Sequence, residues 1–192
     1  MGRKLVKKSG IYYITFTCYN WKSLIALTNA YDTVYKWFNI LTVKGHSILG
    51  YVIMPNHVHL ILHFAGGRQS LNTIIGNGKR FIGYEIITRL EIQNELNLLY
   101  QLKAVVKPKD KIRGKIHELW GDTFDIKECW SENFILQKLI YIHNNPCSGK
   151  WKLAPEPHRY EHSSALFYLN GNAHHFPVKD YREFLHMYYT EE

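Results

Sequence analysis

Runs of mostly apolar residues predict three strands in the first third of the chain. Residues 11–18 (IYYITFTC), 47–54 and 57–64 are rich in β-branched and aromatic residues, which favour extended structure. Pro55 and Asn56 separate the second run from the third. Since Pro beside Asn is typical of a tight turn, these two runs are predicted to form an antiparallel hairpin.

Apolar residues that recur every three or four positions predict helices in other parts of the chain. One such segment covers residues 29–43, and another begins at Ser70 and continues to about Leu99. A third begins after Ser131, a favourable N-cap residue, and is stopped near Asn144 by the proline that follows.

The intervening segments complete the predicted order of elements. Residues 116–126 suggest a further strand or hairpin, with Gly121-Asp122 as a turn, and residues 103–115 resemble a solvated basic loop. The order strand, helix, strand, strand, helix, strand favours an α+β fold with a ferredoxin-like antiparallel sheet and helices packed on it. Residues 1–150 are predicted to form the main domain. Residues 151–192 form a C-terminal extension packed on it, irregular at first and helical from about Asp180.

Composition and charge narrow the possible partners. The chain of 192 residues is 46% hydrophobic, enough for a packed core, and its net charge of +8 makes an anionic partner plausible. Nucleic acid is the commonest such partner, although a membrane surface or ordinary solubility fits the charge as well. The three cysteines form no CxxC pair, and no apolar run approaches the roughly 18 to 20 residues that span a bilayer. We therefore expect a soluble cytoplasmic protein with no membrane partner.

The run MPNHVHLIL contains the first motif that indicates chemistry. Because alternate residues of a strand share a face, His57 and His59 project side by side while Val58 points the other way. Two imidazoles in this arrangement can chelate one metal ion. Two histidines on a half-exposed strand are more often ordinary surface or interface residues, so the spacing alone leaves both interpretations open. His63 lies further along the same face and is assigned a structural role.

The second motif ends the helix that Ser131 caps. Tyr141 and Asn145 are four residues apart and therefore lie on one helical face, a turn apart. A phenol beside a metal-binding amide suits attack on a phosphorus atom. A packed tyrosine with a helix-capping asparagine is the plain alternative. Helical spacing favours Asn145 over the adjacent Asn144 as the partner of Tyr141.

The two motifs together resemble a known family. The sequence PNHVH, followed by a C-terminal helix that contains Tyr-x-x-x-Asn-Pro, is similar to the HUH single-tyrosine transposases. Asn at the fourth position after the tyrosine resembles the REP-associated tyrosine transposases within that superfamily. The similarity runs from SGIYYITFTCYNW through WSENFILQKLIYIHNNP to YEHSSALFYL, and so covers most of residues 9–170.

This resemblance implies a specific reaction. Tyr141 would be the catalytic nucleophile, and His57, His59 and Asn145 would hold Mg²⁺ or Mn²⁺. The enzyme would cleave one DNA strand through a 5′-phosphotyrosine bond, leave a free 3′-hydroxyl, and rejoin strands without a nucleotide cofactor. Substrates in the family are single strands with hairpins. A homodimer is possible, with the tyrosine helix serving its own active site or that of a partner subunit.

Basic and aromatic residues are candidates for DNA contacts. Lys79 and Arg80 on the second long helix, and Lys138 one turn before Tyr141, are predicted to bind DNA. Lys138, or Gln137 beside it, is also a candidate for orienting the phosphate or activating the phenol. Further candidates are a basic arm (Arg3, Lys4, Lys7 and Lys8), the loop 107–115, and three aromatic residues that could stack on unpaired bases (Trp21, Trp151 and Tyr160).

Other classes of protein remain as alternatives. A catalytically silent DNA- or RNA-binding regulator could have the same fold, although a complete set of tyrosine, histidines and asparagine argues against loss of the chemistry. Replication and conjugation nickases share the paired histidines, but they are generally larger. A hydrolytic zinc enzyme is disfavoured because no third histidine, cysteine or carboxylate stands at a suitable short spacing.

Overall fold

The computed structural model describes residues 5–188, with the backbone alone at residues 122 and 123. Helices and strands follow the chain in an order close to that predicted. They are β1 (Gly10–Cys18), η1 (Tyr19–Trp21), α1 (Leu24–Leu27), α2 (Tyr31–Val43), β2 (Ser47–Met54), β3 (His57–Phe64), α3 (Leu71–Ile92), α4 (Leu96–Ala104), α5 (Pro108–Ile112), β4 (Trp120–Glu128), α6 (Glu132–Asn144), η2 (Asn145–Cys147), η3 (Pro157–Arg159), α7 (Ala165–Asn170) and η4 (Tyr181–Met187), where η marks a 3₁₀-helix.

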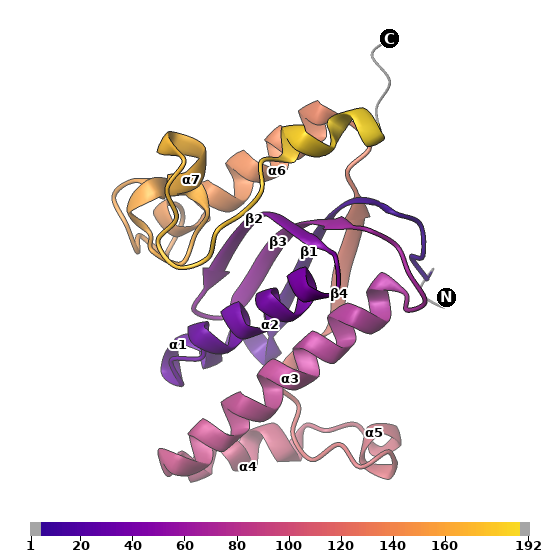
Figure 1. Ribbon diagram of the computed structural model, residues 1–192. Coiled ribbons are helices and arrows are strands. Elements are labelled where there is room, and N and C mark those ends of the chain that lie inside the picture. The colour runs from indigo at the N-terminus through magenta and orange to yellow at the C-terminus, as the bar shows by residue number, and fades with distance from the viewer. Residues whose placement is uncertain (1–4, 189–192) are drawn as a thin grey trace.

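The strands form one antiparallel sheet. In the described part of the chain it has four strands in the order β2-β3-β1-β4, and every neighbouring pair is antiparallel. The connections through α2 and α3 give the βαββαβ order, so the predicted ferredoxin-like α+β fold is confirmed (Figure 1). The hairpin predicted at Pro55-Asn56 joins β2 to β3, an inner strand that carries both histidines of the HxH motif.

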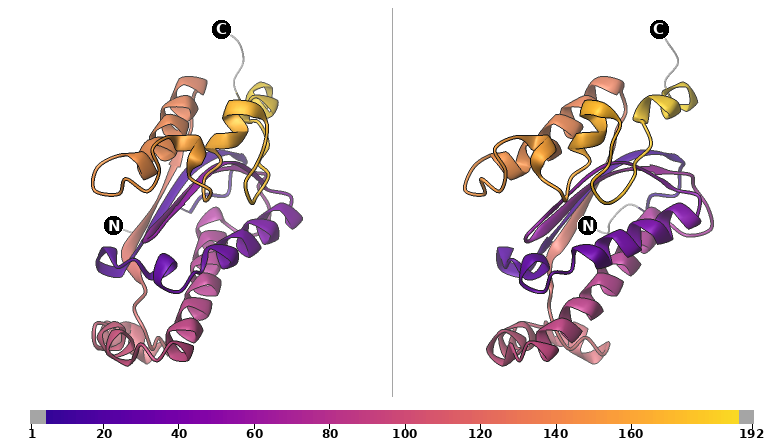
Figure 2. Two further views of the ribbon diagram at one scale, coloured as in Figure 1. Left: turned by 90° about the vertical axis from the view of Figure 1, so that its left-hand side faces the viewer. Right: turned by 60° about the vertical axis from the view of Figure 1, so that its left-hand side comes forward.

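Helices cover both faces of the sheet (Figure 2). Tyr12, Ile14 and Phe16 of β1 point toward α2 and α3 and belong to the larger apolar core. Residues of the opposite parity, such as Tyr13 of β1 and Ile61 of β3, belong to a second core beneath α6 and the C-terminal segment. Because strand side chains alternate between faces, the same alternation directs the histidines of the HxH motif toward the face that α6 partly covers.

The predicted helix 70–99 is wrong in one respect, because the structure divides it in two. Ser70 caps α3 by accepting a hydrogen bond from the backbone N–H of Thr73, and the helix ends at Ile92. Asn94 then adopts φ 63°, in the left-handed region that asparagine tolerates, and α4 begins two residues later. The segment 103–115 is likewise not a simple loop, since it contains the end of α4 and all of α5.

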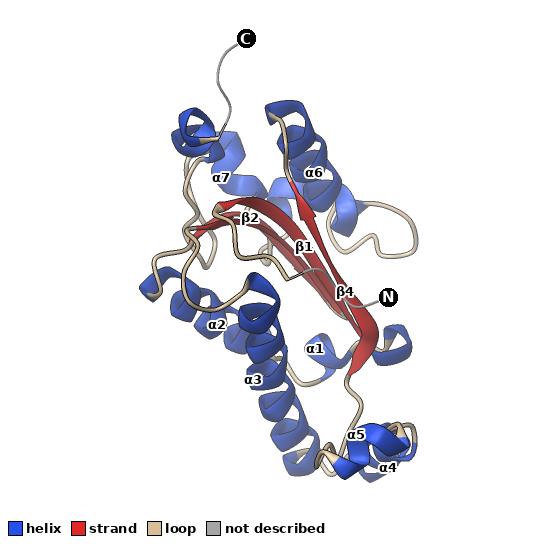
Figure 3. Cartoon of the chain, turned by 90° about the vertical axis from the view of Figure 1, so that its right-hand side faces the viewer, coloured by secondary structure: helices blue, strands red, loops and turns tan. Residues whose placement is uncertain are grey.

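The later elements also refine the prediction. β4 is one continuous strand rather than a hairpin, and Gly121 lies within it; Figure 3 shows it running from the end of the molecule formed by α4 and α5. The helix expected from about Asp180 is the 3₁₀-helix η4, which Asp180 caps by accepting a hydrogen bond from the Arg182 N–H. Within residues 5–188, none of the helices has the length and apolar character needed to cross a bilayer.

The C-terminal segment is attached to β2. The Ser164 hydroxyl is hydrogen-bonded to both backbone groups of Tyr51, at 2.9 Å from the N–H and 3.2 Å from the carbonyl. It also lies 2.9 Å from Nε2 of His143 in α6. One buried serine therefore joins α6, β2 and the segment before α7. The division of the chain at residue 150 stays a prediction.

Alanine substitutions at two glycines of α3 are expected to affect stability differently. A Cβ atom at Gly78 would overlap the indole of Trp37, a buried residue of α2, whereas a Cβ at Gly76 would meet nothing within 4 Å. We expect Gly78→Ala to lower the free energy of unfolding by about 3 kcal/mol, since overpacked cores cannot absorb an added methyl group. Gly76→Ala should leave it unchanged or raise it by up to about 1 kcal/mol through helix propensity. Urea unfolding of both variants measures the difference, and equal stabilities would contradict the packing of α2 on α3.

Candidate active site

A cleft of about 580 Å³ lies on the face of the sheet that α6 partly covers. Strand register places Thr15 of β1 opposite His59 on one side and opposite Asp125 of β4 on the other. The floor of the cleft is therefore formed by β3, β1 and β4, and one wall is formed by the C-terminal half of α6. The residues that line it are Tyr13, Thr15, Thr17, Trp21, His57, His59, Asp125, Lys127, Lys138, Tyr141, Asn145 and Trp151.

His57 is held in one orientation by its neighbour Asn56. The His57 Nδ1 atom lies 2.6 Å from Asn56 Oδ1, which can only accept, so Nδ1 carries the proton and donates it. The Asn56 amide is itself fixed, because its Nδ2 donates to the Trp21 carbonyl at 2.9 Å. This leaves the His57 Nε2 lone pair available to bind a cation, the arrangement in which a supporting hydrogen bond sets the tautomer of a ligand.

His59 has the same tautomer for a different reason. Its Nε2 lies 3.2 Å from Asn145 Nδ2, a donor, so Nε2 is the accepting nitrogen and Nδ1 carries the proton. Nδ1 then donates to the Tyr13 hydroxyl at 2.8 Å, and the Tyr13 ring stacks on the imidazole with 5.7 Å between ring centroids. Both histidines thus present an Nε2 lone pair, and the centroids of their rings are 4.7 Å apart.

Burial keeps both imidazoles uncharged at neutral pH. It lowers the pKa of His57 to about 4 and that of His59 to about 3, with the neighbouring His57 and Lys138 as smaller causes for His59. Burial is also the main cause of the raised pKa of the Tyr13 phenol, so this hydroxyl stays protonated. Uncharged imidazoles are the form that binds metal ions, and protons therefore do not compete for these nitrogens near pH 7.

Tyr141 lies beside this pair of histidines. It is 53% exposed, and its ring meets the His59 ring edge to face with 5.4 Å between centroids. Ser131 caps the start of α6, as predicted, by accepting a hydrogen bond from the Phe134 N–H. Tyr141 lies in the last turn of α6 and Asn145 is its C-cap residue, so the two side chains, four residues apart, reach the same cleft.

The two adjacent asparagines have different contacts in the structure. Asn145 contacts His59, whereas the Asn144 side chain is exposed and donates to the Ile140 carbonyl of its own helix. The tyrosine, both histidines and Asn145 of one chain line the same cleft.

Three basic residues predicted to bind DNA occupy different faces. Lys138 lines the cleft, with its ammonium group 5.2 Å from the centre of the Tyr13 ring and 4.8 Å from that of Phe134. Lys79 instead lies over the rings of Trp120 and Phe124, on the α3 side of the sheet. Arg80 is exposed and donates to Asn77 of the same helix. The structure therefore places Lys138 with the tyrosine, and Lys79 and Arg80 away from it.

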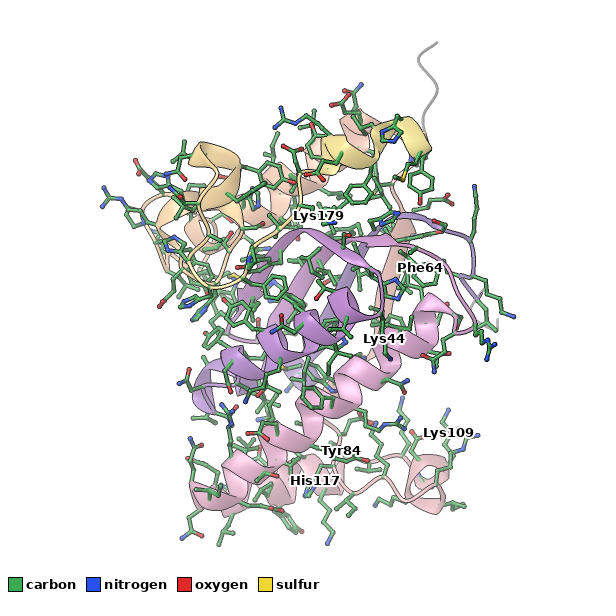
Figure 4. The ribbon with its side chains drawn as sticks, viewed as in Figure 1. Lys44, Phe64, Tyr84, Lys109, His117 and Lys179 are labelled. Atoms are coloured by element: carbon green, nitrogen blue, oxygen red, sulfur yellow. The ribbon has the colours of Figure 1, made fainter. Side chains whose placement is uncertain are left out.

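The candidate loop 107–115 lies outside the cleft. Residues 107–115 are largely exposed around α5, at the end of the molecule where Figure 4 labels Lys109 and His117, remote from Lys179. A hydrogen bond from Lys22 to Gln101 joins α4 to the segment that follows η1. Of the predicted basic arm, Arg3 and Lys4 lie outside the described residues. Binding of DNA by these basic residues stays a prediction.

The three aromatic residues proposed to stack on bases differ in exposure. Trp21 and Trp151 line the cleft, and Trp21 is 62% exposed. The suggestion for Tyr160 is wrong, because its side chain is 8% exposed and its hydroxyl donates to the Ile53 carbonyl. Tyr160 follows η3 and packs beneath the C-terminal segment, a tertiary contact that composition alone does not reveal.

Sequence reasoning missed two residues that orient the histidines. Asn56 was assigned only to the turn and Tyr13 only to a strand, yet each receives the Nδ1 proton of one histidine. Polar residues of a strand facing the HxH pair were the available signal for Tyr13. No local signal distinguishes the buried Asn56 from an ordinary turn residue.

The donor set in the cleft, two imidazole nitrogens and one amide, fits a divalent cation. Two neutral imidazoles present Nε2 lone pairs, and the Asn145 amide lies against one of them. An amide oxygen is a ligand that Mg²⁺ and Mn²⁺ accept, and binding through it would require a half-turn of the Asn145 amide from the orientation in which Nδ2 lies against His59 Nε2. Among the side chains that the structure describes, no three His, Cys, Asp or Glu residues gather as a metal site.

Comparison with known proteins is consistent with these observations. No protein-family model matches the chain, and no curated protein matches it significantly. A solved structure of a REP-associated tyrosine transposase bound to a REP hairpin superimposes with a TM-score of 0.59 at 15% identity, covering 93% of this chain and 91% of that one. A candidate transposase from Deinococcus radiodurans gives a TM-score of 0.39 at 18% identity, covering 75% and 95%, too low to indicate a shared fold. The chain therefore has the fold of a REP-associated tyrosine transposase, and the resemblance carried by its two motifs is confirmed at the level of the fold.

Proposed function

We propose that this protein is a metal-dependent DNA strand transferase that cleaves and rejoins single-stranded DNA with Tyr141 as its nucleophile. The observation that carries the proposal is the meeting, within one cleft, of an exposed tyrosine with two histidines of the same tautomer and Asn145. His57, His59 and Asn145 would hold Mg²⁺ or Mn²⁺. When bound, the ion supplies positive charge that polarises the phosphate and stabilises the charge of the transition state.

In the proposed reaction the bonds formed and broken balance, and so do the protons, without a nucleotide cofactor. The Tyr141 oxygen attacks phosphorus, the Oη–P bond forms and the P–O3′ bond breaks. The phenol loses one proton and the leaving 3′ oxygen gains one. A 3′-hydroxyl that attacks the phosphotyrosine reverses these steps and rejoins a strand. Lys138 lies one helical turn from Tyr141 and lines the same cleft, so its positive charge is available to the phosphate.

The proposed substrate is a single strand that also contains a hairpin. The solved transposase of similar fold is bound to a REP hairpin, and the cleft, whose lining includes Lys127 and Lys138, suits an extended phosphate backbone. The cytoplasm is the compartment in which we infer that the protein meets this DNA, and a homodimer stays a possibility for its assembly. The competing proposal, a silent DNA- or RNA-binding regulator, requires the same cleft to bind without reacting.

A metal-dependence experiment separates the two proposals. We expect purified protein, incubated with hairpin-bearing single strands and Mg²⁺ or Mn²⁺, to form a covalent adduct that migrates as a DNA-linked protein on a denaturing gel. EDTA added before the DNA should prevent adduct formation, and excess Mn²⁺ should restore it, because the neutral histidines can rebind the ion at pH 7. Binding of the same strands with no adduct in either metal would favour the regulator.

A further inference from the structure

Two tryptophans lie at the metal-ligand end of the cleft. Trp21 comes from η1, near the N-terminus, and Trp151 comes from the turn that follows η2, about 130 residues later. Each ring lies close to His57, with centroids 6.0 Å away for Trp21 and 6.2 Å away for Trp151. Two large apolar rings therefore adjoin the position where the proposed function places the reacting phosphate.

The exposed position of Trp21 is energetically unfavourable. Its side chain is 62% exposed, although burying an indole would stabilise the fold. Its backbone has φ 55° and that of Asn20 has φ 48°, in the left-handed region that bulky residues avoid. Strain of this kind persists only where surrounding contacts enforce it, and it gathers at ligand sites.

A single buried side chain fixes Trp21 relative to His57. Asn56 donates through Nδ2 to the Trp21 carbonyl, and through Oδ1 it accepts the Nδ1 proton of His57. Asn56 is fully buried, and its carbonyl accepts a further hydrogen bond from the N–H of Cys18, just before η1. The backbone that carries the indole is thus tied to a proposed metal ligand, and the centroid of the Trp21 ring lies 6.0 Å from that of His57.

The chemistry of the cleft selects a nucleobase as the group that meets these rings. The ammonium groups of Lys127 and Lys138 suit phosphates, while an indole offers a flat apolar face with no charge. Every nucleobase has a π face, and stacking on aromatic side chains binds unpaired bases with little dependence on sequence. A base in a duplex has both faces occupied by its neighbours, so such a platform favours single strands.

We propose that Trp21, together with Trp151, forms a stacking site for an unpaired nucleobase next to the phosphate that Tyr141 attacks. This rests on the proposed function, since the cleft must receive a single strand. The stacked base would set which phosphate lies beside Tyr141 and would exclude duplex DNA from the cleft. Trp21 is then a substrate-positioning residue rather than a catalytic one.

A binding experiment that requires no chemistry tests the site. In a Tyr141→Phe background, we expect Trp21→Ala to weaken binding of a hairpin with a single-stranded flank by about 5- to 150-fold at fixed salt, the range for loss of one base–aromatic stack. Trp21→Phe, which keeps an aromatic face, should retain most of the affinity. Trp130→Ala is the matched control, because Trp130 is 70% exposed but stacks on Phe134 outside the cleft.

Abasic substitution on the DNA identifies the partner of the ring. One abasic position in the flank should weaken binding to the Trp21 form about as much as Trp21→Ala does, and the two changes together should cost no more than either alone. Binding by Trp21→Ala as tight as that of the Trp21 form would contradict the stacking site. So would a loss of affinity from Trp21→Ala that adds fully to the loss from every abasic position. Trp151→Ala, with circular dichroism to check folding, repeats the test should Trp21→Ala not fold.

Failure of the stacking site and failure of the proposed function give different results. An adduct that forms with Tyr141 present, alongside binding that is indifferent to Trp21, removes only the stacking site. Binding that depends on Trp21 and on one base, with no adduct in either metal, removes only the strand transfer and leaves a single-strand-binding protein.

Discussion

Tyr141→Phe is expected to abolish the covalent protein–DNA adduct while leaving the fold and DNA binding intact. Phenylalanine keeps the ring that meets His59 edge to face but lacks the oxygen that would attack phosphorus. Because the side chain is 53% exposed, no buried hydrogen bond is left unsatisfied by the change. We expect the rate of adduct formation to fall by on the order of 10⁴-fold or more, the size of effect seen when a covalent nucleophile is removed.

The control for this substitution is another exposed tyrosine. Tyr100 of α4 is 73% exposed and does not line the cleft, so Tyr100→Phe should form the adduct at an unchanged rate. Both variants are compared on a denaturing gel with labelled hairpin DNA and Mn²⁺, and binding is followed separately by fluorescence anisotropy. An adduct that survives in Tyr141→Phe would show that another residue is the nucleophile.

His59→Ala is expected to have the second largest effect, because it removes three contacts at once. The imidazole presents one proposed ligand nitrogen, lies against the Asn145 amide and binds the Tyr13 hydroxyl. Loss of a residue that merely supports a metal ligand already lowers affinity by about 10- to 100-fold. We therefore expect Mn²⁺ affinity to fall by at least about 100-fold, with adduct formation lost at the same metal concentration.

His63 provides the matched control on the same strand. It shares the strand face with His59, but its Nε2 lies 2.8 Å from the Tyr188 hydroxyl and its ring packs on Phe184. His63→Gln should bind Mn²⁺ as the unaltered protein does, even if its stability changes. Titration calorimetry or the Mn²⁺ EPR signal measures affinity directly and without DNA. Equal Mn²⁺ affinity for His59→Ala and His63→Gln would exclude His59 as a ligand.

Part of the candidate site, the placement of Tyr141 and Asn145 by α6, could be predicted from local sequence. The Ser131 cap, the stop near Pro146 and the four-residue spacing predicted that Tyr141 and Asn145 share one face of one helix. Alternation in β3 likewise predicted that His57 and His59 project together. Both predictions depend only on the backbone geometry of a single element, which neighbouring residues determine.

Local sequence patterns could not predict which side of the sheet a helix covers. The pattern of α3 indicates which of its residues face a core, but not which side of the sheet the helix covers. Lys79 and Arg80 therefore look as plausible as Lys138 in the sequence, and the structure places them on the side away from Tyr141. The assignment depends on how the connections cross the sheet, which involves the whole fold.

The sequence by itself determined the order of elements, the pairing of the two histidines and the spacing of tyrosine and asparagine, because each follows from the period of one helix or strand. Only the tertiary structure decided that Tyr13 and Asn56 orient the histidines, that Asn145 meets His59, and that Trp21 stands at the cleft. The Tyr13–His59 and Asn145–His59 contacts join residues 46 and 86 positions apart. Such contacts depend on strand register and on the docking of α6, which packing of the entire chain determines and no local pattern records.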